Sequence, residues 1–261
     1  MLTSSLVLFL IAQAALPAPP ALDIRRLTLS APSAVVAIDA VALQGQPAML
    51  AWSPDGRELY LRLVHTDRWG NERVRHFVVA LAEKRLAPVA EEPAWSPAYW
   101  LRKSALAAPG APEFTISVES RQERRTATGV VSAGGMAQSG GDPNLGAELG
   151  PQGQAIVMSA IQAQQVRTTT LRLKGDTLGE FVNTNVVQGL TYGWSPSGAI
   201  IAFAGPKQFL ELMDSAGRKR EVREVKDVLL PAWSGDMARL ACLQRKGRNK
   251  FAITLLDVSA R

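Results

Sequence analysis

The sequence predicts an all-β protein assembled from copies of one repeat, and three observations support this. A Trp-Ser-Pro-Asp-Gly motif at residues 52–56 returns with small changes at 194–198 and 233–236. Each copy is followed closely by an aliphatic run, as a strand follows a tight turn. The composition, with 21 Gly and 16 Pro in 261 residues, suits a chain with many turns.

Two further copies of the motif are degraded. Trp95-Ser96-Pro97 keeps the first three positions of the motif. Residues 149–153 keep its Pro, as Pro151, and its Gly, as Gly153. The five copies begin at positions 52, 95, 149, 194 and 233, so the intervals between them are 43, 54, 45 and 39 residues. These intervals bracket the roughly 40–50 residues of a four-stranded propeller blade. The spacing therefore predicts a β-propeller of four-stranded antiparallel blades, with five blades preferred and six as the alternative.

The motif has the chemistry of a turn between two strands. Pro pre-sets φ, Asp or Ser can bond the nearby backbone, and Gly accepts the positive φ that a tight reversal needs. The Trp that ends the preceding strand offers a wide apolar surface to fill the wedge between neighbouring sheets. We therefore expect Trp52, Trp194 and Trp233 to be core residues.

Further hairpins are expected inside the repeats. In the first, strands 59–64 and 74–80 flank a polar tip at 65–72. In the third, a strand at 168–173 precedes a turn, and in the fifth the residues Gly247-Arg248-Asn249 separate two strands. Alternation of apolar and polar residues is only partial, as expected where both faces of a sheet are packed.

Two segments lie outside this pattern. The last repeat lacks an outer strand after Asp257, and the strand candidate 34–43 could supply it and close the ring. The segment 129–148 is rich in Gly and small polar residues and is expected to be a long loop. Such a loop is either a binding element on a rigid ring or an insertion without function.

The combination of Trp-Ser-Pro-Asp-Gly, an apolar strand, a Gly-containing hairpin and a second strand resembles the repeat of TolB-type β-propellers, which are related to WD repeats. The resemblance covers residues 46–258, strongly in three units and weakly in two. It implies a radial propeller. It implies little about a ligand, because such repeats occur in very different proteins.

The N-terminus differs from the repeats. Residues 1–22 are expected to be a signal peptide with a Pro-rich lead, followed by one propeller domain at 23–261. The apolar run 6–15 is too short to span a bilayer, and Ala12-Gln13-Ala14 has the small-x-small form of a cleavage site. We therefore expect a periplasmic or secreted protein with no integral membrane segment after signal removal. Because residues 1–5 contain no Lys or Arg, an uncleaved anchor or a wrongly assigned start is the alternative.

The charge balance permits anionic partners. The net charge is +6 and the isoelectric point is about 9.8. The cations are grouped in short clusters at 121–125, 218–220 and 245–250, which we interpret as solvated loop charge. Nucleic acid is not expected as a partner for an exported chain, and an anionic envelope polymer suits a basic face better.

No constellation of catalytic residues is apparent, so no catalytic, cofactor-binding or metal-binding residues are predicted. His65 and His76 belong to one hairpin, and Cys242 lies in an apolar run typical of a buried, inert thiol. No Gly-x-Ser-x-Gly or phosphate-binding Gly motif occurs. The following acidic residues are expected in turns: Asp55, Asp67, Asp236 and Asp257.

The leading functional hypothesis is a monomeric module of the cell envelope that binds a protein or polymer, or acts as a scaffold, without a cofactor. One alternative is a propeller-type lyase or glycosidase that acts on an envelope polymer, which would need paired carboxylates or His and Arg at the channel mouth. Another is a degenerate structural propeller that associates with a partner protein. Enzymatic activity is left open, with the balance against it.

Overall fold

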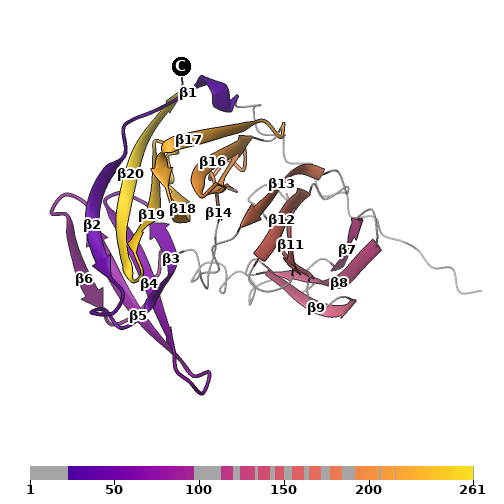
Figure 1. Ribbon diagram of the computed structural model, residues 1–261, viewed down its shortest axis with the longest axis horizontal. Helices are drawn as coiled ribbons and strands as arrows, with labels where there is room; N and C mark the ends of the chain where they lie inside the picture. Colours follow the sequence, from indigo (N-terminus) through magenta and orange to yellow (C-terminus); the bar gives the residue numbers. More distant parts are fainter. Residues whose placement is uncertain are drawn as a thin grey trace, which may run out of the picture.

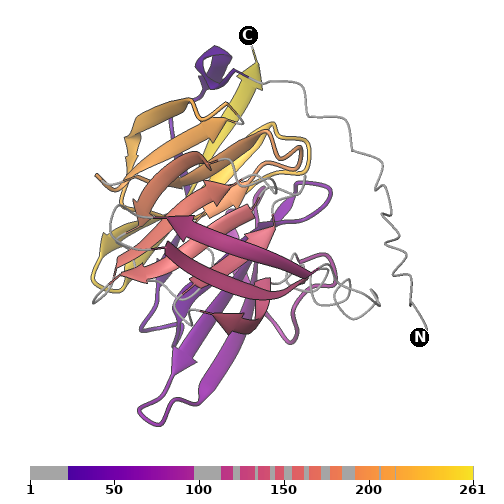
Figure 2. The same cartoon turned by 90° about the vertical axis from the view of Figure 1, so that its right-hand side faces the viewer.

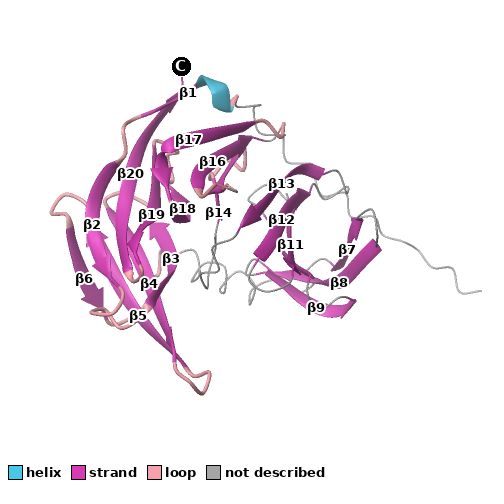
Figure 3. Ribbon diagram, viewed as in Figure 1, coloured by secondary structure: helices cyan, strands magenta, loops and turns pink. Residues whose placement is uncertain are grey.

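The chain is built almost entirely of β-strands (Figure 1, Figure 3). The computed structural model describes residues 23–96, the strands between 113 and 183 by their backbone, and residues 192–260 other than 206 and 215. In this part of the chain the one helical element is a 3₁₀ turn, η1 (Ile24–Arg26), which precedes strands β1 to β20. The all-β prediction is confirmed.

The strands form five antiparallel sheets whose order follows the chain. The first contains β3 (Gln46–Trp52), β4 (Glu58–Thr66), β5 (Glu72–Ala80) and β6 (Arg85–Val89). The second contains β7 (Glu113–Glu119), β8 (Arg124–Ser132) and β9 (Gly135–Gly141). The third contains β10 (Leu145–Leu149), β11 (Ala155–Ile161), β12 (Gln165–Leu171) and β13 (Thr177–Asn183). The fourth contains β14 (Tyr192–Trp194), β15 (Ile200–Ala204), β16 (Phe209–Asp214) and β17 (Lys219–Lys226).

The fifth sheet joins the two ends of the chain. It contains β18 (Val228–Trp233), β19 (Arg239–Gly247) and β20 (Lys250–Ala260), and β20 also pairs with β1 (Leu27–Leu29) and β2 (Ser33–Asp39). The expectation that the N-terminal segment supplies the outer strand of the last sheet is therefore confirmed. β2 ends at Asp39. The Asp39 carboxylate accepts hydrogen bonds from the N–H groups of Val41 (3.0 Å) and Ala42 (3.2 Å), and these bonds begin a turn.

The expected loop at 129–148 is wrong. These residues include the end of β8, all of β9, and most of β10, and β8 pairs with β9 in an antiparallel ladder. Ladder hydrogen bonds come from the backbone, so Gly and small residues can form them without a supporting side-chain pattern. The absence of apolar alternation therefore did not prevent strands here.

The expected copy at Trp95 also differs from the prediction. Trp95 lies in a turn after β6, in which the Ser96 N–H donates to Pro93 O (2.9 Å), and it does not end a strand. The sheet that follows has three strands in the part of the chain described above, rather than the expected four. For the copy at 149–153, β10 ends at Leu149 as expected, and the rest of the motif lies outside the described residues.

The Ser of the motif closes each remaining turn. The Ser53 N–H donates to Glu58 O (3.0 Å), and the Glu58 N–H donates to Ser53 Oγ (2.9 Å). The same two bonds recur between Ser195 and Ile200, and between Ser234 and Arg239. This role of the Ser was not predicted. A Ser hydroxyl can both donate and accept, so it can bridge the two strand ends. The recurrence of Ser at this position in the three copies was the sequence signal for this role.

The first, fourth and fifth sheets pack through their first strands. β3 and β14 both contact β18, so the fifth sheet lies between the first and the fourth (Figure 1). One apolar cluster fills each of the two interfaces, and both clusters contain side chains of β18 and β19. β14 can approach β18 closely because a Cβ at Gly193 would lie 2.2 Å from Pro231 O.

The first and fifth sheets are joined by the wedge that the motif predicted. Trp52 is 7% exposed, and its indole N–H donates to Ala232 O (2.8 Å). The Arg239 guanidinium lies 4.6 Å from the centre of the Trp52 ring and donates from Nη2 to Gly56 O (2.7 Å). Trp233 is equally buried, whereas Trp194 is half-buried. The prediction that these tryptophans are core residues is therefore confirmed for Trp52 and Trp233, and only in part for Trp194.

The basic cluster at 218–220 is not the solvated loop charge that was expected. Arg218 makes ion pairs with the buried Asp214 (2.6 Å) and with Asp23 (3.1 Å). Arg220 donates to the backbone oxygens of Ile24 and Leu27. The bonds to Asp23, Ile24 and Leu27 join residues far apart in sequence, so the cluster fastens the N-terminal segment to the fourth sheet.

Candidate binding surface

The hairpin of β4 and β5 extends beyond the rest of its sheet. The last β3–β4 pair is Gln46 with Val64, and the last β5–β6 pair is His76 with Val89, so residues 65–75 continue beyond both outer strands. We call residues 65–75 the arm. Two views show its tip projecting from the body of the molecule (Figure 1, Figure 2). The arm offers surface that no other described sheet covers.

The tip of the arm is held rigid by Asp67. Its Oδ1 atom accepts hydrogen bonds from the N–H groups of Trp69 (2.8 Å) and Asn71 (2.9 Å), and the Asn71 amide donates to Oδ2 (3.0 Å). The pKa of Asp67 lies below its usual value, chiefly because the hydrogen bonds from Asn71 stabilise the charged carboxylate. Gly70 completes the turn at φ 84°. The tip is therefore a defined structure.

An aromatic side chain is displayed at this tip. Trp69 is 74% exposed, and the Arg68 guanidinium lies 4.5 Å from the centre of its ring. Aromatic side chains are enriched at protein interfaces, and this one is presented on a hydrogen-bonded turn. Trp69 is thus a candidate contact for a partner.

A groove of about 460 Å³ lies at the base of the arm. Its walls include Leu43, Val74, Arg75, His76, Phe77 and Pro88. Arg75 donates from Nη2 to Gln44 Oε1 (2.6 Å), which holds the guanidinium against the loop that forms one wall. An apolar groove with a few positioned polar groups has the general composition of a binding site.

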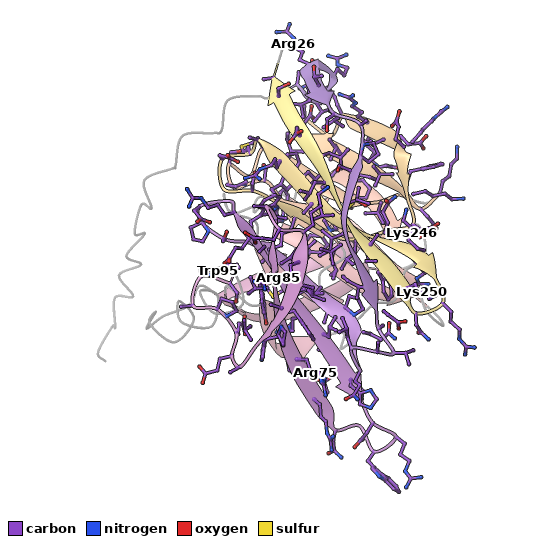
Figure 4. The ribbon with its side chains drawn as sticks, turned by 90° about the vertical axis from the view of Figure 1, so that its left-hand side faces the viewer. Arg26, Arg75, Arg85, Trp95, Lys246 and Lys250 are labelled. Atoms are coloured by element: carbon purple, nitrogen blue, oxygen red, sulfur yellow. The ribbon has the colours of Figure 1, made fainter. Side chains whose placement is uncertain are left out.

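Several positive side chains lie on the same side of the molecule as this groove. Figure 4 shows Arg75, Arg85, Lys246 and Lys250 on this side. Arg73 lies on β5 and Arg248 lies in the turn between β19 and β20, and both are exposed. The ion pairs of the described residues use other cations, namely Arg25, Arg57, Arg218 and Arg223. In the part of the chain that the structure describes, these exposed cations therefore have no carboxylate partner.

The two histidines do not form a pair. His65 lies opposite Arg73, and His76 lies opposite Arg62, so they are at different places along the hairpin. His76 Nδ1 is hydrogen-bonded to the Tyr60 hydroxyl (2.7 Å), and Tyr60 also contacts Trp95 edge-to-face. His76 therefore helps to fill the inner face of the first sheet.

The other residues that the sequence singled out have structural roles. Cys242 is fully buried, and burial raises the pKa of its thiol to about 12, so it is inert as expected. Asp55, Asp67 and Asp236 lie in turns as predicted. Asp257 lies within β20, opposite Arg239, so that turn assignment is wrong.

Neither a metal centre nor a membrane-spanning helix is found among the residues that the structure describes. No group of three His, Cys, Asp or Glu side chains lies together there in a way that could hold a metal ion. Within the same ranges no helix is long and apolar enough to cross a bilayer.

Comparison with known proteins adds little to this geometry. No protein-family model matches the chain, and no curated protein matches it. The TolB-like assignment therefore stays a prediction.

Similar solved structures include two oligogalacturonate lyases. One, in complex with manganese, has a TM-score of 0.33 and 9% identity over 80% of this chain and 64% of that chain. The other, from Vibrio parahaemolyticus, has a TM-score of 0.31 and 8% identity over 82% of this chain and 65% of that chain. This chain thus spans less than two thirds of either, and a likeness this weak carries no argument about activity or substrate.

Proposed function

We propose that this chain is an exported β-propeller of five blades that binds a protein or polymer of the cell envelope. The observation that carries the proposal is the arm: its hydrogen-bonded tip displays Trp69, and an apolar groove and exposed cations lie at its base. A binding role explains why an exposed indole and exposed cations are placed on well-formed strands and turns.

The five sheets support the blade count. Four of them consist of consecutive strands, and the fifth adds β1 and β2 to the consecutive strands β18, β19 and β20. Pairing of β2 with β20 joins the start of the chain to its last sheet, which is the usual device for holding a ring closed. An experimental structure that contained a sixth blade, or an open arc of sheets, would overturn this part of the proposal.

Export rests on the N-terminal apolar run. We expect the mature protein to begin at Ala15, after cleavage behind Ala14. N-terminal sequencing of protein recovered from the periplasm or the medium tests this. A mature chain that still begins at Met1 and stays in the cytoplasm would contradict it.

The binding role is tested by capture with matched variants. Wild-type protein and a Trp69→Ala, Val74→Ser variant are immobilised and exposed to envelope extracts. Both side chains are exposed, so we expect the variant to keep the wild-type unfolding midpoint and to lose a partner that the wild type retains. Arg57→Ala is the control, because that side chain is 85% exposed at the other end of the same sheet. Equal capture by all three proteins would refute binding through the arm.

A further inference from the structure

The outer edge of β5 is open over the arm. β5 pairs with β4 from Glu72 to Ala80, but with β6 only from His76 to Ala80. Residues 72–75 therefore have a β-strand neighbour on one side only, among the strands described. Four residues of strand span about 13 Å, which is enough for a short segment to pair with.

Among the described residues, no strand covers this edge. β6 ends at Val89, and Ala90 and Glu91 bend away from the line of the strand before Pro93. A segment that continued the direction of β6 would lie antiparallel to β5, across from residues 72–75. The groove lies at this place, since its walls include residues from both Val74–Phe77 and Leu86–Ala90.

The side chains along the open edge alternate in character. Arg73 and Arg75 are two residues apart and lie on one face, while Val74 lies on the other face and is 44% exposed. A pairing strand places its own side chains opposite these, so its residues must alternate as well. Carboxylates would face the arginines, and apolar side chains would face Val74 on the other side of the strand.

Like charge argues against two other occupants. In the antiparallel register that sets Val74 opposite Val74, a second copy of this edge would place Arg73 opposite Arg75, which is unfavourable across a strand pair. A basic segment would meet the same repulsion. Glu72, the carboxylate next to this pair in sequence, is exposed.

From these observations we propose that the open edge of β5 captures an extended peptide segment of a partner protein, in which acidic and apolar residues alternate. The segment adds as a strand beside residues 72–75, extends the line of β6, and sets carboxylates against Arg73 and Arg75. This inference rests on the proposed binding function and names the chemical class of the partner.

The test uses a fluorescein-labelled hexapeptide that alternates Val and Glu, with binding to the whole protein followed by anisotropy. A second peptide replaces Glu by Lys, and a third carries N-methyl groups on alternate backbone nitrogens, which remove the donors that a strand pair needs. We expect the Val/Glu peptide to bind at least tenfold more tightly than either of the other two.

Two protein variants locate the site. Arg75→Glu should weaken binding of the Val/Glu peptide at least tenfold and should strengthen binding of the Val/Lys peptide. Arg85→Glu makes the same charge change on β6, outside the groove, and should change affinity less than twofold. Circular dichroism of both variants confirms that each is folded, and the gain for the Val/Lys peptide cannot arise from unfolding.

Several outcomes would overturn the proposal. Equal binding of the N-methylated peptide would mean contact without strand addition, and equal losses in both variants would mean general attraction to the basic face. No binding of the Val/Glu peptide to wild type would also refute it. If the Arg75→Glu protein still captures the partner that depends on Trp69 and Val74, the binding function stands and strand addition fails.

Discussion

The two ends of the β3–β6 sheet are closed by turns of similar chemistry in opposite surroundings. At one end the Asp55 carboxylate accepts from the Arg57 N–H (3.1 Å) and Gly56 has φ 68°. At the arm, Asp67 and Gly70 repeat this arrangement, with φ 84° at the glycine. We call these the joint turn and the arm turn.

What differs is the neighbour. A Cβ at Gly56 would lie 2.5 Å from Arg239 Nη2, whereas nothing lies within 4 Å of a Cβ at Gly70. The joint turn is covered by the fifth sheet, and the arm turn faces solvent. The comparison teaches that local chemistry makes each turn, while packing decides whether the turn supports the fold or is available for binding.

The largest expected difference concerns the two tryptophans. Trp52→Ala removes a buried ring and its hydrogen bond to Ala232 O, so we expect a loss of about 3–5 kcal/mol in the free energy of unfolding. Trp69→Ala removes an exposed ring and should change that free energy by no more than about 0.5 kcal/mol. Urea unfolding of both variants measures this. Similar losses in the two variants would show that the arm also supports the fold.

The glycines give the next largest difference. Gly56→Ala and Gly70→Ala both place a Cβ at positive φ, which costs about 1–2 kcal/mol. Gly56→Ala also displaces Arg239, which should add about 1–3 kcal/mol through the lost hydrogen bond and ring contact. Thermal or urea unfolding of the two variants side by side measures the difference.

A double-mutant cycle isolates the contribution of the arginine. In an Arg239→Met background the cost of Gly56→Ala should fall to that of Gly70→Ala, because the guanidinium is already absent. If the cost of Gly56→Ala were unchanged in that background, Arg239 would not be the reason for the difference between the turns.

The smallest effect is a shared dependence on pH. The pKa of Asp55 is lowered chiefly by the Ser53 hydroxyl, and that of Asp67 chiefly by the Asn71 amide. A lowered pKa means that the unfolded chain binds more protons in acid, so the contribution to stability is present above about pH 4 and is lost as pH falls through the lowered pKa.

Asp55→Asn and Asp67→Asn should each flatten the acid side of the pH–stability profile slightly and to a similar extent. Unfolding midpoints in urea between about pH 5 and about pH 2 check this, since that range contains the titration. Because both carboxylates are exposed, a large effect at the joint turn alone would mean that burial, and not local hydrogen bonding, controls Asp55.

Prediction from sequence succeeded where the repeat was well preserved. The Trp-Ser-Pro-Asp-Gly turns, the hairpin with its tip within 65–72, and the pairing of the N-terminal strand with the last sheet were all anticipated. It was wrong at 129–148 and at Trp95, where either the apolar pattern or the turn residues were missing. Strands pair through backbone hydrogen bonds, so a strand made of small residues has no side-chain pattern from which it could be predicted.

The candidate binding surface was not predicted at all. Leu43 and Pro88 are far apart in sequence and line one groove only after β3 to β6 have formed one sheet. The open edge of β5 depends on where β6 ends, and β6 ends at Val89, before a bend. Val74 and Arg75 therefore carried no signal of their own.

The sequence by itself determined the all-β class, the repeat, and the chemistry of each turn, because φ preferences and side-chain hydrogen bonds act over a few residues. Only the tertiary structure decided that Arg239 covers Trp52, that Trp69 is displayed, and that Arg73 and Arg75 border an open edge. Burial and strand pairing depend on residues distant in the chain, and no local pattern specifies which neighbour will cover a given turn.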